Sequence, residues 1–139
     1  MISIDDAMND RMDDPGGAAA CTPNISAAGR RRRRRIGAQF AGVSIAAAGA
    51  GVIFRAPWAA RAAVFLPAAI SAIGYLQASR NTCVMRAREG TLEHDDFTTE
   101  PAPATDVAAS RRVSAGIYRD ALLIGAGAAC IAIATALFR

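Results

Sequence analysis

The sequence RRRRRRIGAQFAGVSIAAAGAGVIF, residues 30–54, joins six consecutive arginines to 19 residues that carry no charge. Because an α-helix rises about 1.5 Å per residue, the uncharged run is about as long as the hydrocarbon core of a bilayer is thick. An arginine block beside an apolar run is typical of the cytoplasmic end of a transmembrane helix. We therefore predict a first membrane span over residues 36–54. Its predicted topology anchor comprises Arg30, Arg31, Arg32, Arg33, Arg34 and Arg35.

The arginine block has three other interpretations. Clustered arginines neutralise nucleic-acid phosphates, but this block has no interleaved aromatic residues and no folded platform, so we expect no nucleic-acid partner. Arginine pairs before an apolar run also resemble a twin-arginine secretion signal. However, the run exceeds the usual length of about 7–15 residues for such signals, and two more apolar segments follow. Binding of anionic lipid headgroups is compatible with anchoring, so membrane lipids are the first partners that we expect.

The composition favours a membrane protein over a soluble one. Hydrophobic residues make up 53% of the 139 residues and the mean hydropathy is +0.21, although aromatic residues make up only 6%. Much of the apolar content is alanine, which buries little area per residue in a soluble core. In a membrane, by contrast, small residues let helices approach closely. The length suffices for one domain, which we place at residues 30–139.

The N-terminal segment, residues 1–29, differs from the rest of the chain. It holds five aspartates and one arginine. The sequence DDPGG at residues 13–17 favours irregular structure. We predict that this segment is a disordered acidic tail.

The second apolar segment is predicted to return across the membrane, so that the first two spans form a helical hairpin. The loop RAP at residues 55–57 interrupts the first helix, because the residue before a proline avoids the helical conformation. The next span covers residues 58–79, with Trp58 suited to the membrane interface. Arg61 lies one turn inside and is expected to extend outward along its apolar stem. Pro67 is expected to kink this helix; a functional gate at Pro67 is the alternative interpretation.

The third predicted span covers residues 118–138 and follows a cytoplasmic loop, residues 80–117. The second helix is expected to extend beyond the membrane as far as Gly90, because glycine is common just after helix C-termini. The sequence TTEPAP at residues 98–103 is expected to form a linker. Asp106 is expected to cap a helix that starts at about the next residue and leads into the third span.

The distribution of arginines predicts the orientation of the spans. With the N-terminus inside, the cytoplasmic side holds residues 30–35 and six arginines between residues 80 and 120. The opposite side holds Arg55, Arg61 and Arg139. Positive charge gathers on the cytoplasmic side of membrane proteins. Since all 16 basic residues are arginine and alanine is abundant, we expect a bacterial inner-membrane protein, with its N-terminus in the cytoplasm and its C-terminus outside.

Two rows of small residues recur at every fourth position. On a helix, this spacing keeps the residues on one face, which suits close packing against another helix. The rows comprise Ala38, Gly42, Ala46 and Ala50 in the first span and Ala128, Ala132 and Ala136 in the third. We predict that both rows are helix-packing surfaces. Four polar residues in or near the spans are expected to bridge helices: Gln39, Ser44, Gln77 and Thr135.

Few residues indicate chemistry. The only histidine, His94, lies in the acidic sequence EHDD at residues 93–96, where no second histidine or suitably spaced cysteine completes a metal site. Cys83 has Arg80 and Arg86 at helical distance, an arrangement that favours a reactive thiolate, although we favour a packing role. No charged residue lies deep inside a span, whereas ion-coupled transporters carry such residues. We expect no metal, no cofactor and no enzymatic activity.

The exit from the second span, GYLQASRNTCV at residues 74–84, resembles a stretch in small uncharacterised bacterial inner-membrane proteins. The resemblance implies a membrane location and no particular activity. The sequence therefore predicts an all-α integral membrane protein with three transmembrane helices. We expect an accessory or structural subunit that acts through helix–helix contacts with other membrane proteins or with another copy of itself. The alternatives are a small transporter or channel subunit and a membrane-bound thiol sensor that uses Cys83.

Overall fold

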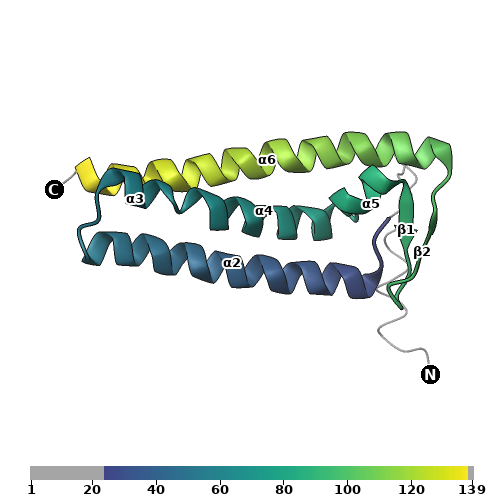
Figure 1. The fold of residues 1–139 in the computed structure, drawn as a ribbon, viewed down its shortest axis with the longest axis horizontal. Helices are drawn as coiled ribbons and strands as arrows, with labels where there is room; N and C mark the ends of the chain where they lie inside the picture. The colour runs from purple at the N-terminus through teal and green to yellow at the C-terminus, as the bar shows by residue number, and fades with distance from the viewer. Residues whose placement is uncertain (1–23, 138–139) are drawn as a thin grey trace, which may run out of the picture.

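The computed structural model describes residues 24–137, which form three long helices side by side (Figure 1). Helix α2 (Ala27–Ile53) and helix α6 (Ala104–Leu137) lie on either side of a broken helix, which consists of α3 (Trp58–Ala62) and α4 (Phe65–Ser79). Consecutive helices of this bundle run in opposite directions. All three are long and apolar enough to span a membrane. The predicted three-span α-helical membrane fold is therefore confirmed.

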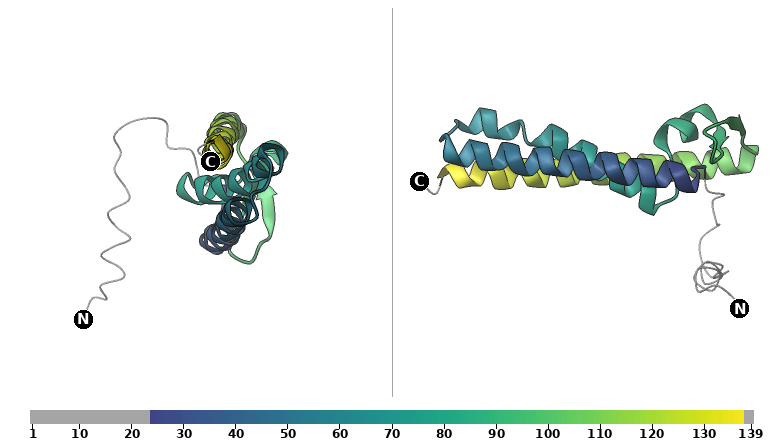
Figure 2. Two further views of the ribbon diagram at one scale, coloured as in Figure 1. Left: turned by 90° about the vertical axis from the view of Figure 1, so that its left-hand side faces the viewer. Right: turned by 90° about the horizontal axis from the view of Figure 1, so that it is seen from below.

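A small polar unit joins α4 to α6 at one end of the bundle (Figure 2). It consists of helix α5 (Val84–Glu89) and two short antiparallel strands, β1 (Thr91–Glu93) and β2 (Thr99–Pro101). Leu92 pairs with Glu100 at the centre of this hairpin. The second strand occupies residues that were predicted to be a linker.

Helix α2 begins three residues before the arginine block. Ser26 caps it, since the backbone N–H of Gly29 donates a hydrogen bond to Ser26 Oγ at 3.0 Å. Asn24 and Ile25 are each only 2% exposed. Residues 24–29, predicted as the end of a disordered tail, therefore belong to the folded protein. The rest of that predicted tail, residues 1–23, lies outside the described residues.

The second span is broken near Pro67, as predicted, but the break precedes the proline. Helix α3 ends at Ala62 and α4 begins at Phe65, so Pro67 lies in the first turn of α4. Proline has no backbone N–H to donate and is tolerated best in the first turn of a helix. The chain therefore starts a new helix just before Pro67 instead of bending a continuous one.

The segment between the second and third spans differs from its predicted form in two places. Helix α4 ends at Ser79 and the chain turns through Asn81, whose φ is 50°, so the second helix does not run on continuously to Gly90. Gly90 does end the next helix, α5, with φ 70° and ψ 38°, a left-handed conformation that glycine adopts easily. Helix α6 begins at Ala104, so Asp106 lies within its first turn, near the positive end of the helix dipole, and does not cap it.

Small residues set the distances between the helices. Where α2 meets α4, a Cβ atom at Gly74 would lie 3.0 Å from the Cα of Gly37. Ser71 Oγ donates a hydrogen bond to the carbonyl oxygen of Gly37 at 2.8 Å. Where α4 meets α6, a Cβ at Gly125 would lie 3.0 Å from the Cβ of Ala69. Such close approaches between backbones are typical of membrane helices.

Candidate functional site

The arginine block occupies the first turns of α2, beside the polar unit. A helix N-terminus is electrically positive, so these charges oppose the helix dipole and do not stabilise α2. Within residues 24–137, Arg33 is the only member of the block with a carboxylate partner. The members without one are Arg30, Arg31, Arg32, Arg34 and Arg35. Their charge is therefore available to groups outside the described chain.

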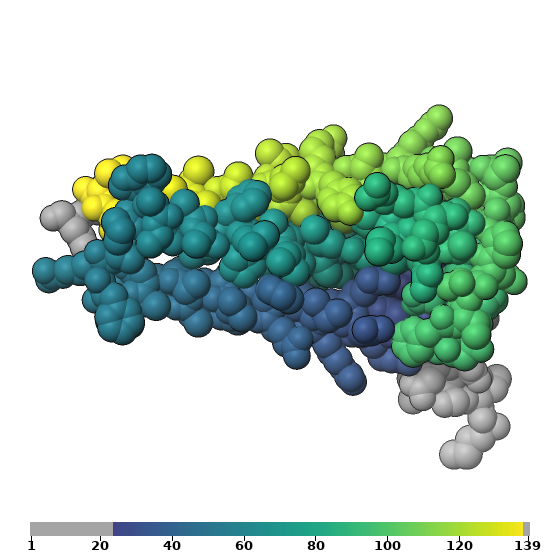
Figure 3. Space-filling view, in the orientation of Figure 1, coloured from purple at the N-terminus to yellow at the C-terminus, as the bar shows by residue number. Residues whose placement is uncertain are grey.

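Glu93, at the end of β1, provides a negative charge beside the start of α2. Its side chain is 6% exposed, and its carboxylate lies 3.9 Å from Arg33 Nη2 and 3.6 Å from Arg86 Nε. Ser26 Oγ donates a hydrogen bond to Glu93 Oε1 at 3.4 Å. A Cβ atom at Gly29 would overlap Glu93 Oε1, so a glycine is needed at that position. These contacts hold the hairpin against α2, and the two lie in contact in the space-filling view (Figure 3).

A second hairpin carboxylate also contacts the first turn of α2. Asp95 Oδ1 accepts a hydrogen bond from the backbone N–H of Ala28 at 3.2 Å, which satisfies one of the free N–H groups of a helix start. The next residue, Asp96, accepts hydrogen bonds from Thr98 within the hairpin loop. The Thr98 hydroxyl, at 2.6 Å, and the Thr98 N–H, at 3.0 Å, hold the pKa of Asp96 below its usual value of 3.8.

His94 lies on the exposed side of the hairpin. Its Nε2 is 3.3 Å from Glu100 Oε1, and both side chains are about half exposed. Among residues 24–137, no group of three or more His, Cys, Asp or Glu side chains is placed to hold a metal ion. The acidic loop thus contacts α2 through two of its carboxylates and exposes its histidine.

Cys83 is packed inside the polar end. It is 1% exposed, and Arg33 Nη2 lies 2.9 Å from its Sγ. Its backbone N–H donates to Asn24 Oδ1 at 2.6 Å, while Asn24 Nδ2 donates to the Cys83 carbonyl at 3.2 Å. The guanidinium beside the thiol therefore comes from Arg33 and not from Arg80 or Arg86, because α4 ends before Cys83 and removes the helical spacing. This burial favours the packing role for Cys83.

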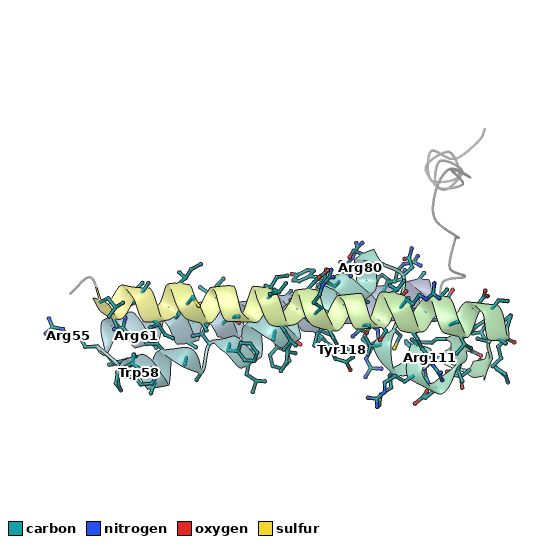
Figure 4. All side chains as sticks on the ribbon, turned by 90° about the horizontal axis from the view of Figure 1, so that it is seen from above. Arg55, Trp58, Arg61, Arg80, Arg111 and Tyr118 are labelled. Carbon is teal, nitrogen blue, oxygen red and sulfur yellow. The ribbon has the colours of Figure 1, made fainter. Side chains whose placement is uncertain are left out.

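Arg80 connects the ends of two spans. Its Nη2 lies 2.5 Å from Asp120 Oδ2, and Arg119 Nη2 lies 2.9 Å from the other carboxylate oxygen. Arg80 follows α4 whereas Asp120 lies on α6, so this pair joins the second and third helices near the polar unit. Figure 4 places Arg80 and Arg111 in this half of the molecule and Arg55 at the opposite end.

At that opposite end, Arg61 turns inward and not outward, contrary to prediction (Figure 4). It is 4% exposed, its Nε donates to the carbonyl of Ala56 at 2.8 Å, and its Nη1 donates to Thr135 Oγ1 at 2.7 Å. These two acceptors offset the cost of burying a charge. Thr135 thereby bridges α3 and α6, as predicted. Ser44, by contrast, bonds to the Phe40 carbonyl in its own helix at 2.8 Å.

The two remaining polar residues of the spans form no bridge among the described residues. Gln39 is exposed on α2. Gln77 is buried on α4, and its Oε1 atom has no hydrogen-bond partner. The bridging role between α2 and α4 belongs instead to Ser71, which was not singled out from the sequence.

The two rows of small residues lie on different kinds of surface. The row on α2, comprising Ala38, Gly42, Ala46 and Ala50, is exposed along its whole length. No atom lies within 4 Å of a Cβ built at Gly42, whereas α2 contacts its neighbours through a face that includes the buried Gly37 and Gly51. In the row on α6, Ala132 is buried, and Ala128 and Ala136 are partly exposed.

No family model, curated protein or solved structure matches this chain. The assignment therefore rests on the molecule itself, whose three apolar helices define a small multi-pass membrane protein. Its polar end combines a charged helix start with an acidic hairpin. The carboxylate of Glu93 and the contact between Gly37 and Gly74 were not predicted, because both depend on residues that lie far apart in the sequence.

Proposed function

We propose that the protein is an accessory or structural subunit of the bacterial inner membrane that acts through helix–helix contacts. One observation carries this proposal: α2 presents an exposed row of small residues, Ala38, Gly42, Ala46 and Ala50, on the side away from its own bundle. A helix face that contacts only lipid could carry bulky apolar side chains equally well. Small ones allow a second backbone to come close, which is the usual basis of helix association in membranes.

The arginine distribution supports a cytoplasmic N-terminus for this subunit. Arg80, Arg86 and Arg88 lie in or beside the polar unit, at the same end as the arginine block. Arg55 and Arg61 lie at the other end. Positive charge is retained on the cytoplasmic side. We therefore assign the polar end to the cytoplasm and the loop between α2 and α3 to the outside.

The proposal is tested by enlarging the exposed row. In a Gly42→Leu/Ala46→Leu double variant, the added side chains prevent close approach of a partner helix. Overpacking of this kind costs about 1–3 kcal/mol, which corresponds to about a 5- to 150-fold loss of affinity. The measurement is native mass analysis of the complex that elutes with the tagged protein from membranes in mild detergent.

Ala47→Leu provides the control, because Ala47 is also exposed on α2 but lies outside the row. We expect this variant to retain the complex seen with the unchanged protein. If the double variant and the control give the same complex with the same stability in detergent, the row is not a partner surface and the proposal fails.

A further inference from the structure

A basic hollow lies between the start of α2 and the end of α4. Its volume is about 350 Å³, and its lining comprises Ala27, Arg30, Arg31, Arg34, Ala78, Ser79 and Asn81. Within residues 24–137, no carboxylate lines it and none of its three arginines has a carboxylate partner. Guanidinium groups bind phosphate oxygens through paired hydrogen bonds. The hollow therefore suits a phosphate group.

An apolar groove lies in line with this hollow, on the same faces of α2 and α4. Its first part, of about 370 Å³, is lined by Ala41, Ser44, Ile45, Ala68, Ser71, Ala72, Tyr75, Leu76 and Ile124. Its second part, of about 610 Å³, lies between α2 and α6 and shares Ser44 and Ile45 with the first. Arg34, Ala41 and Ala48 recur every seventh residue, which keeps hollow and groove on one side of α2.

The spacing of hollow and groove fits the thickness of one leaflet. Eleven residues separate Arg34 from Ile45, which is about 16 Å along a helix at about 1.5 Å per residue. Half of a hydrocarbon core about 30 Å thick is about 15 Å. A lipid whose headgroup lies in the hollow thus extends its acyl chains along the first part of the groove.

We propose that the protein holds an anionic glycerophospholipid, with its phosphate against Arg30, Arg31 and Arg34 and its acyl chains in the groove beyond Tyr75. Basic pockets between transmembrane helices are known to hold anionic headgroups in this way. A second copy docked in parallel on this face would bring its own arginine block against the first, which like-charge repulsion disfavours. The proposal is independent of the packing row on α2, because that row lies outside the residues that line the hollow and the groove.

Two charge-matched variants of the full-length protein test the headgroup contact. Arg30→Gln/Arg34→Gln removes two charges from the hollow, whereas Arg32→Gln/Arg35→Gln removes two charges from the same block outside it. Each purified protein, stripped of lipid in neutral detergent, is titrated with phosphatidylglycerol, phosphatidylcholine and glycerol phosphate, and bound molecules are counted by native mass spectrometry. Far-UV circular dichroism verifies that each variant keeps its helices.

We expect the unchanged protein to bind phosphatidylglycerol at least about tenfold more tightly than phosphatidylcholine. Loss of charge-assisted hydrogen bonds should lower that affinity about tenfold or more in the hollow variant and less than about threefold in the other. Equal losses in both variants would show a diffuse field and overturn the proposal. Glycerol phosphate that binds as tightly as the lipid would overturn it too, because the groove would then contribute nothing.

The groove is tested separately. Ala41→Phe fills its first part, so it should weaken binding of phosphatidylglycerol about tenfold while the Ala47→Phe control, at an exposed position outside the groove, leaves binding unchanged. If Ala41→Phe binds the lipid as the unchanged protein does, the acyl chains do not lie in the groove and the proposal is wrong.

Discussion

At the scale of single residues, Glu93 carries the contact between the hairpin and α2. Its carboxylate faces two guanidinium groups, and one of them, that of Arg33, also contacts the buried Cys83. Glu93→Gln keeps the size of the side chain but leaves Arg33 and Arg86 without their shared negative charge. Because both arginines are about a quarter exposed, solvent weakens the effect, and we expect the hairpin to be destabilised by about 1–2 kcal/mol.

The rate at which a maleimide labels Cys83 measures this loosening. A background with Cys21→Ser and Cys130→Ser leaves a single thiol. Local opening that costs about 1.4 kcal/mol less raises the labelling rate about tenfold. Glu100→Gln is the matched control, since Glu100 also lies in the hairpin but its side chain is about half exposed and pairs with His94 instead of α2. Equal labelling rates in the two variants would rule out a structural role for Glu93.

At the scale of the helices, α2 and α4 meet through Gly37 and Gly74. A Cβ at Gly74 would lie 2.8 Å from the backbone oxygen of Arg33, and backbone cannot move aside as a flexible side chain does. We therefore predict that Gly74→Ala destabilises the bundle by about 1–3 kcal/mol, despite the higher helix propensity of alanine. The measurement is the midpoint of unfolding by SDS in mixed micelles, followed by circular dichroism.

Gly127→Ala provides the comparison for Gly74→Ala. Gly127 is also inside a helix, but no atom lies within 4 Å of a Cβ built there. This variant should unfold at the same SDS concentration as the unchanged protein or at a higher one. A shift of the same size and direction in both variants would mean that the α2–α4 approach is not tight.

Two glycines of α2, Gly37 and Gly42, show how much of the fold the sequence predicts. The three spans were predicted because their uncharged runs match the bilayer; the arginine block precedes the first span and Arg80 follows the second. The face that each helix buries was not predicted. Ala and Gly recur so often on α2 that the sequence does not distinguish the exposed Gly42 from the buried Gly37. Gly37 is buried because it contacts Ser71 and Gly74 on α4, and these residues lie more than 30 positions away in the sequence.

Of the candidate site, only the arginine block at the start of α2 was predictable from the sequence. Consecutive arginines are evident in the sequence, but Glu93, the partner of Arg33, lies about 60 residues away in a segment without apolar periodicity. The hairpin forms because α5 ends at Gly90 and its acidic loop bonds to the first turn of α2. Neither the strand pairing nor this docking leaves a periodic signal in the sequence.

At the scale of the whole molecule, three spans place the two ends of the bundle on opposite sides of the membrane. The polar end carries the arginines that have no carboxylate partner within residues 24–137, so we predict that it faces the cytoplasm. Two single-cysteine variants, His94→Cys and Arg55→Cys, report on which side of the membrane each end lies. In both, the cysteines of the unchanged chain are replaced by serine. Loss of Arg55 removes a positive charge from the predicted outer side and therefore favours the same orientation.

A membrane-impermeant maleimide applied to intact bacterial cells whose outer membrane has been made permeable distinguishes the two sides. We expect it to label the chain with Arg55→Cys at once and the chain with His94→Cys only after the inner membrane is opened. Figure 4 shows Arg55 projecting beyond the end of the helices, so a thiol there is accessible to the reagent. Labelling in the reverse order would place the arginine block outside. The lipid bound in the basic hollow would then belong to the outer leaflet, because the spacing of hollow and groove fits either leaflet.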